Sequence, residues 1–175
     1  MIYFTSDLHI SHTNIIRFCN RPFSDVHSMN KHMTETWNKI VKPEDEIYIL
    51  GDFSFKNTKR RIRDAMSRLN GKKYMIKGNH DRSDELNNLL NSKLIEWWKY
   101  NYEFTYEYKG KNYTILLSHY PHYPTSDNVI CLYGHIHERI LSDVINGAFN
   151  VGVDCVGYEP ISIEKLIEQY DINRK

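Results

Sequence analysis

Five short blocks of metal-binding residue types are spread along this chain, and each block follows an apolar run. The blocks are Asp7-Leu8-His9, Gly51-Asp52, Gly78-Asn79-His80-Asp81, Ser118-His119 and Gly134-His135-Ile136-His137. In open α/β sheets, ligands bind beyond the carboxyl ends of the strands, because several strand ends share that edge. If each apolar run is a strand, the five blocks meet at one edge although they lie far apart in the sequence. The pattern therefore predicts a sheet-based fold with a single site.

The first half of the chain alternates predicted strands with predicted helices. Residues 46–50 and 73–76 are apolar runs typical of strands, whereas apolar positions in 26–41 and 58–69 recur every three or four residues, as in helices. Ser24 is expected to cap the first of these helices. This alternation indicates a largely parallel sheet with crossover helices.

The second half has a different pattern. Strands are predicted at 104–108, 113–117 and 129–133, and Asn146-Gly147 is a hairpin signal between segments 139–145 and 148–153. A last helix is expected at 163–170, with Ser162 as its cap. These strands are expected to be mostly antiparallel. Two mixed sheets packed face to face, with helices outside, accommodate both halves in an α/β fold.

Size and charge narrow the class of protein. The chain has 175 residues, is 41% hydrophobic and carries a net charge of +1, which fits one domain over residues 1–175 and predicts no electrostatic attraction to nucleic acid or membranes as a whole. No run is long and apolar enough to span a membrane, and the start of the chain lacks the pattern of a signal peptide. Three widely spaced cysteines are typical of a reducing compartment, so a cytoplasmic protein is expected.

Each block alone is a weak signal, but their conjunction is specific. Asp-x-His triplets often only cap helices, and lone strand-end histidines are commonly structural. In this order, the blocks resemble the calcineurin-like metallophosphoesterase superfamily, whose pattern is D-x-H, G-D, G-N-H-[DE], H and G-H-x-H. Segments 6–16 and 150–154 resemble the small single-domain members from bacteria and their phages. The resemblance implies a four-layer α-β-β-α sandwich of two mixed sheets flanked by helices.

The resemblance also implies a role for each block. It implies seven ligands for two divalent metal ions, with Asp52 bridging both ions. The ligands of the first ion are Asp7, His9 and His137, and those of the second are Asn79, His119 and His135. A water between the ions is then expected to attack the phosphorus of a phosphate ester. Manganese is the first choice of metal, with iron, zinc, nickel and cobalt as alternatives.

Two further residues match the family's catalytic positions. His80 matches the histidine beside the leaving group and is expected to act as a general acid. Asp81 is expected either to hold the His80 ring in one tautomer or to cap the following helix.

Three residues are candidates for substrate contacts: His12, Asn14 and Lys77. Lys77 stands where protein phosphatases of the superfamily have an arginine, and lysine cannot form the same bidentate fork with a phosphomonoester. A phosphodiester or a nucleotide is therefore preferred as substrate over a phosphoprotein.

Other functions stay open from the sequence. Basic residues crowd segment 56–77, which favours a nuclease acting on nucleic acid if they face the site, and a solvated helix face otherwise. A non-catalytic metal-binding scaffold is a further alternative, although every ligand position is filled. A structural zinc site is the least suitable, since such sites favour thiolates. The sequence predicts neither the physiological ester nor the oligomeric state.

Overall fold

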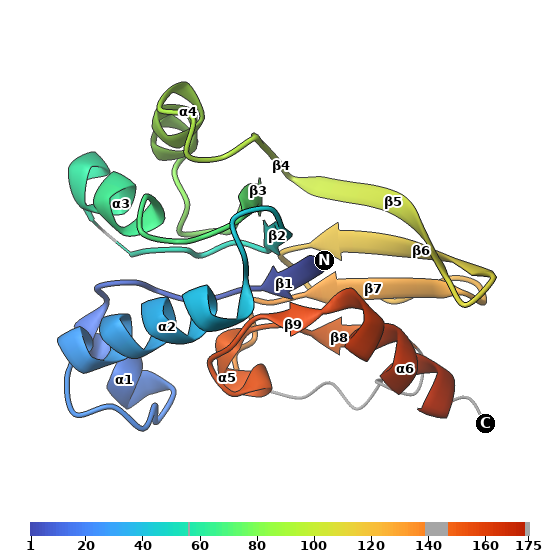
Figure 1. Ribbon diagram of the computed structural model, residues 1–175. Helices are drawn as coiled ribbons and strands as arrows, with labels where there is room; N and C mark the ends of the chain where they lie inside the picture. The colour runs from blue at the N-terminus through green and yellow to red at the C-terminus, as the bar shows by residue number, and fades with distance from the viewer. Residues whose placement is uncertain (56, 139–146, 174–175) are drawn as a thin grey trace.

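The first half of the chain forms most of a five-stranded, largely parallel sheet (Figure 1). We describe residues 1–55, 57–138 and 147–173 of the computed structural model. The strand order is β4-β3-β2-β1-β9, and only β9 runs antiparallel to its neighbour. The strands are β1 (Ile2–Thr5), β2 (Glu46–Ile49), β3 (Lys72–Ile76), β4 (Trp97–Lys99) and β9 (Ile161–Ser162).

Helices between these strands cover one face of the sheet. They are α2 (Val26–Ile40), α3 (Lys59–Met66) and α4 (Ser83–Asn91), and the shorter α1 (Thr13–Phe18) precedes them. Met33 and Trp37 of α2 and Met66 of α3 are buried in the cluster between these helices and the sheet. Large apolar side chains of this kind stabilise a fold by about 1.5–3 kcal/mol each when fully buried.

The second sheet has the order β5-β6-β7-β8. Its strands are β5 (Asn101–Tyr108), β6 (Lys111–Ser118), β7 (Val129–Tyr133) and β8 (Ala148–Asn150). Only β5 and β6 form an antiparallel hairpin, whereas β6–β7 and β7–β8 are parallel, so the expectation of a mostly antiparallel sheet is wrong. Alternation within a strand looks the same for both directions, and the connection decides which one forms. The strand expected at 139–145 and its turn residue Asn146 lie outside the described residues.

Apolar side chains of both sheets meet in a second core. Phe4 and Leu50 of the first sheet pack with Ile115 and Leu132 of the second. Helix α6 (Ile163–Asn173) adds buried side chains to the same cluster, and Val156 of the short helix α5 (Val153–Val156) packs against it. The predicted α/β class, two mixed sheets with flanking helices, is confirmed.

Of the caps predicted for α6 and α2, the first is confirmed and the second is wrong. Ser162 accepts a hydrogen bond from the Lys165 N–H at the start of α6, as predicted. The cap of α2 is Asp25 rather than Ser24, because the Asp25 carboxylate accepts the N–H groups of His27 and Ser28, both at 2.8 Å. In the described part of the chain, no helix has the length and apolar character needed to cross a bilayer.

Parallel pairing brings the ends of the strands to one edge. In the first sheet Thr5 of β1 pairs with Ile49 of β2, which lies beside Met75 of β3. In the second sheet Leu117 of β6 pairs with Leu132 of β7. The blocks of metal-binding residue types follow shortly after these paired positions. The register of the strands therefore places the blocks at one edge.

Candidate metal centre

The loops of the site hold an unusual backbone conformation. Five non-glycine residues that the sequence predicts as ligands have positive φ angles, between 49° and 72°: Asp7, His9, Asp52, His135 and His137. Such left-handed conformations are unfavourable for most side chains and cluster where surrounding structure enforces them, often at functional sites. Backbone hydrogen bonds tie the loops together, from Asp7 N–H to Gly51 O at 3.1 Å and from His9 N–H to Asp52 O at 3.0 Å.

Glycine permits the close approach of these loops. A Cβ atom on Gly51 would lie 2.5 Å from the His119 ring, and one on Gly78 would lie 2.6 Å from the Asp52 nitrogen. Gly51 also has a φ of 97°. Side chains at these positions would push the loops apart, so glycine is needed there.

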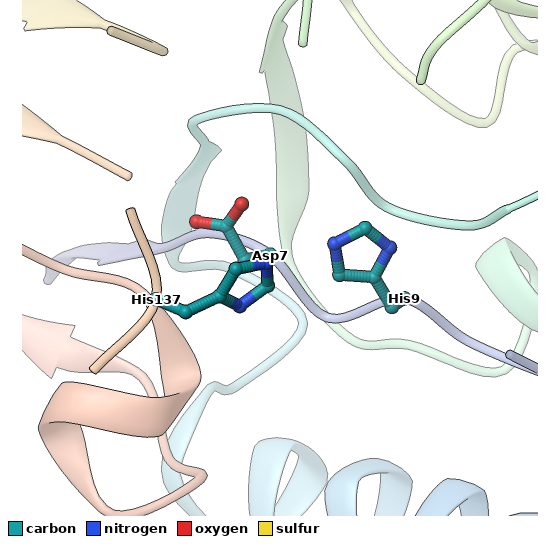
Figure 2. Close-up of side chains that lie close together, drawn as sticks. All are labelled: Asp7, His9 and His137. Carbon is teal, nitrogen blue, oxygen red and sulfur yellow. The ribbon is translucent and has the colours of Figure 1, made fainter. Parts of the chain in front are cut away.

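The first candidate ligand group is Asp7, His9 and His137, whose ligand atoms all lie within 4.8 Å of one another (Figure 2). Among the described residues, neither ring nitrogen of His9 has a hydrogen-bond partner, nor does Asp7 Oδ1, although all three atoms are buried. Burial, helped by the nearby His137 charge, lowers the pKa of His9 to about 2, so its ring is neutral. Buried polar atoms are almost always paired, and a bound cation would satisfy Asp7 Oδ1 and the unprotonated nitrogen of the neutral His9 ring.

The second group converges on Asn79. Its Oδ1 lies 2.9 Å from His119 Nε2 and 2.9 Å from His135 Nδ1. The other His119 nitrogen, Nδ1, lies 2.8 Å from the Leu50 carbonyl oxygen, which can only accept. In a neutral ring Nδ1 therefore carries the hydrogen and Nε2 presents a lone pair to the Asn79 oxygen. Two lone pairs that face each other repel, and a cation bound by both atoms would remove this repulsion.

Asp52 lies between the two groups. One carboxylate oxygen, Oδ2, is 3.8 Å from His9 Nε2 in the first group and 3.6 Å from His119 Nε2 in the second. Bonds of about 2.0–2.2 Å to a shared divalent ion place its ligand atoms about 3–4 Å apart, so the donor set fits two ions with Asp52 common to both. Burial raises the Asp52 pKa to about 7, against the opposing hydrogen bond from the His80 N–H.

Comparison with known proteins agrees with this geometry. The sequence model of the calcineurin-like phosphoesterases matches residues 1–172. This chain belongs to the calcineurin-like phosphoesterase family.

Several proteins are similar in sequence to this phosphoesterase over most of its length. An uncharacterised protein of Methanocaldococcus jannaschii is 35% identical over 184 residues, covering 99% of this chain and 94% of the relative. The gene 66 protein of Mycobacterium phage L5 is 29% identical over 181 residues, covering 89% and 87%. A solved structure of a protein of unknown function from Aquifex aeolicus superposes with a TM-score of 0.73 at 28% identity, covering 96% and 98%. The resemblance to phage proteins is thus confirmed.

A cleft of about 520 Å³ opens beside the ligand groups of this calcineurin-like phosphoesterase. Its described lining includes two predicted substrate contacts, His12 and Asn14, together with His80, and also Phe55 and Phe18. His80 Nε2 is 3.9 Å from Asp52 Oδ2, and the side chain of His80 is 39% exposed. The predicted general acid therefore faces solvent and the ligands at once.

Asp81 binds the backbone of the ligand loops. Its buried carboxylate accepts the backbone N–H groups of Asp52 at 2.8 Å, Phe53 at 3.2 Å and Gly78 at 2.9 Å. It therefore fixes the two ligand loops, a role that the sequence did not suggest. The alternative that Asp81 caps the following helix is wrong, because Arg82 is the cap residue of α4.

Lys77 is not brought to the cleft. Its Nζ lies 3.4 Å from the Gly78 carbonyl oxygen and 5.9 Å from the centre of the Tyr100 ring. It is absent from the described lining of the cleft, and its contact with substrate stays a prediction.

Sequence reasoning missed one residue of the site, Arg21. Its guanidinium binds both oxygens of Asp154, at 2.8 and 2.9 Å, and donates to the carbonyl oxygens of Leu8 and Asp7. Asp154 Oδ2 in turn lies 2.8 Å from His137 Nδ1. Burial alone would lower the His137 pKa, but the hydrogen bonds to Asp154 and Cys19 raise it to about 10. No local signal marks Arg21, since its partner is 133 residues away.

Proposed function

We propose that this protein is a phosphodiesterase that uses two divalent metal ions in a single domain spanning residues 1–175. The observation that carries the proposal is the position of Asp52, with one carboxylate oxygen between the two groups of candidate ligands. The unpaired buried atoms of Asp7 and His9 support it further, because they leave ligand capacity that no described side chain uses.

Seven residues would hold the ions: Asp7, His9, His137 and Asp52 on one, Asn79, His119, His135 and Asp52 on the other. When bound, a pair of divalent ions supplies Lewis acidity and a hydroxide nucleophile at neutral pH. Oxygen and imidazole donors without thiolate suit manganese, iron, zinc, nickel or cobalt, and manganese is our first choice. The hydrogen bond between Asp154 and His137 Nδ1 fixes the orientation of the His137 ring and leaves its other nitrogen for an ion.

His80 is the proposed general acid. Hydrolysis of a diester adds water to phosphorus and breaks one P–O bond, which leaves a phosphomonoester and an alkoxide. His80 lines the cleft beside Asp52 and would give its proton to the departing oxygen, so the alcohol leaves neutral. Its backbone N–H donates to Asp52 Oδ1 at 2.9 Å, which fixes the loop that carries it.

The charge of the cleft lining favours a phosphodiester, such as a nucleotide diester, over a phosphomonoester. The described residues lining the cleft include no lysine or arginine, while Lys56 lies outside the described residues. A diester carries one negative charge and needs less clamping than a monoester, which carries nearly two.

Nucleic acid as substrate has weaker support. Within the basic segment, Lys59 pairs with Asp84 at 2.9 Å and Arg60 with Asp64 at 3.8 Å. Lys73 is buried and donates to the carbonyl oxygens of Leu69 and Gly71. These basic side chains therefore bind groups of the protein itself, which weakens the case that the segment binds nucleic acid.

The test compares hydrolysis of bis-(p-nitrophenyl) phosphate and p-nitrophenyl phosphate, with manganese and again with a chelator. We expect faster turnover of the diester, abolished by the chelator and by Asp52→Asn. Asp25→Asn is the matched control, because Asp25 is an exposed helix cap and asparagine caps equally well. Faster turnover of the monoester, or diester turnover that survives the chelator, would contradict the proposal.

A further inference from the structure

One wall of the cleft ends in an exposed aromatic side chain. Phe18, the last residue of α1, lines the cleft and is 61% exposed. The preceding Ile15 of the same helix is buried, so α1 is anchored by one face while Phe18 points away from the core. An exposed large apolar residue is unremarkable by itself, but here it stands at the mouth of a site.

Rings connect Phe18 to the candidate metal ligands. The centre of its ring lies 6.3 Å from that of His12 in an edge-on contact, and His12 stacks on Phe55 at 4.3 Å. The His12 ring is 5.5 Å from the ligand His9, and Phe55 meets His80 edge-on at 4.7 Å. A wall of aromatic rings, inclined to one another, thus runs from the ligands to Phe18.

The chemistry of this wall favours a planar, polar ring over an alkyl chain. The Arg17 guanidinium lies 5.6 Å from the centre of the Phe18 ring, which puts a cation at the outer end of the wall. The imidazole edge of His12 adds polar atoms between the two phenyl rings. Bases stack on aromatic side chains and gain from a nearby arginine, whereas an acyl chain gains nothing from either. A volume of about 520 Å³ is also within the range of small-molecule sites.

We propose that Phe18, backed by the His12–Phe55 stack, is a platform on which the nucleobase of a nucleotide diester stacks. This inference rests on the proposed phosphodiesterase function and names its substrate class. Stacking of a base on an aromatic side chain contributes about 1–3 kcal/mol, so removing the Phe18 ring weakens binding about tenfold.

The experiment uses two diesters with the same leaving group. The p-nitrophenyl ester of thymidine 5′-monophosphate carries a base on the retained arm, and methyl p-nitrophenyl phosphate carries none. In the manganese-loaded protein, Phe18→Ala should raise KM for the thymidine ester about tenfold and leave kcat and the methyl ester unchanged. Phe18→Trp should restore the KM. Ile172→Ala, which removes an equally exposed apolar side chain from α6, is the control and should change neither ester.

Direct binding separates this inference from the proposed function. Calorimetry of thymidine 5′-monophosphate with the same variants needs no turnover and should show the same tenfold loss in Phe18→Ala. Failure to hydrolyse either ester, with this loss intact, would refute the diesterase and leave the platform standing. Equal effects of Phe18→Ala on both esters, or unchanged nucleotide binding, would overturn the platform while the diesterase stands.

Discussion

Replacing Asp52 with asparagine should stabilise the metal-free protein while it removes the activity. Asp52 is buried, and its carboxylate oxygen Oδ2 lies 3.8 Å from His9 Nε2 and 3.6 Å from His119 Nε2. Ionising it in that state is unfavourable, because burial removes the water that would solvate the charge. The substitution to asparagine keeps the shape and an oxygen that can accept the His80 N–H, and it removes the charge.

The pKa of Asp52 gives the magnitude and the sign. An unperturbed aspartate titrates at 3.8, and burial raises the pKa of Asp52 to about 7. Between these pH values the folded state keeps a proton that the unfolded chain has lost, so the free energy of unfolding falls as the pH rises from about 4 to about 7. At about 1.4 kcal/mol for each pKa unit, the loss is about 4 kcal/mol above pH 7. For a chain of this size, that corresponds to roughly 8–16 °C in Tm.

Thermal unfolding in the presence of a chelator tests this reasoning. Near pH 8, Asp52→Asn should melt higher than the parent by roughly that interval, and near pH 5 the difference should shrink to roughly two fifths of it. Asp25→Asn should leave Tm unchanged at both pH values, because Asp25 is an exposed cap. A variant that melts lower than the parent near pH 8, or a gain independent of pH, would refute the argument that the buried charge is the cause.

Three further predictions concern the surroundings of the ligands. Arg21→Met leaves buried Asp154 without its bidentate partner, so we expect about 3–5 kcal/mol lower stability and about 10–100-fold weaker metal binding by calorimetry, whereas the exposed Arg60→Met changes neither. His80→Asn should lower kcat about 100–10,000-fold with metal content unchanged, and an equal loss of metal would assign His80 a structural role instead. Manganese affinity should fall as the pH drops below about 10 and more steeply below about 7, since first His137 and then Asp52 must lose a proton to bind, and an affinity independent of pH would contradict the raised pKa values.

The sequence predicts the parts of the fold that depend on local pattern. The strand that ends before Asp52 and the strand that ends before Asn79 are found where the apolar runs lie. Parallel register then places their polar ends together, so gathering at one edge follows from pattern and topology alone. The glycines before these residues are likewise explained by close loop contact.

Long-range contacts could not be predicted in this way. The direction of β7 relative to β6 depends on the path of the connection between them, which has no periodic signal. Arg21 and Asp154 meet only in the folded chain, and the Asp81 carboxylate accepts the N–H of Asp52, which is 29 residues away. Short elements such as α1, which carries Phe18, contain too few residues to show a period.

The most direct test of the central claim is anomalous diffraction from crystals of the manganese-loaded protein. Our account predicts two peaks about 3.5–4 Å apart, one beside His9 and the other beside Asn79, with Asp52 in contact with both ions. A single peak, or two peaks that do not share Asp52, would contradict a dinuclear centre and with it the proposed chemistry.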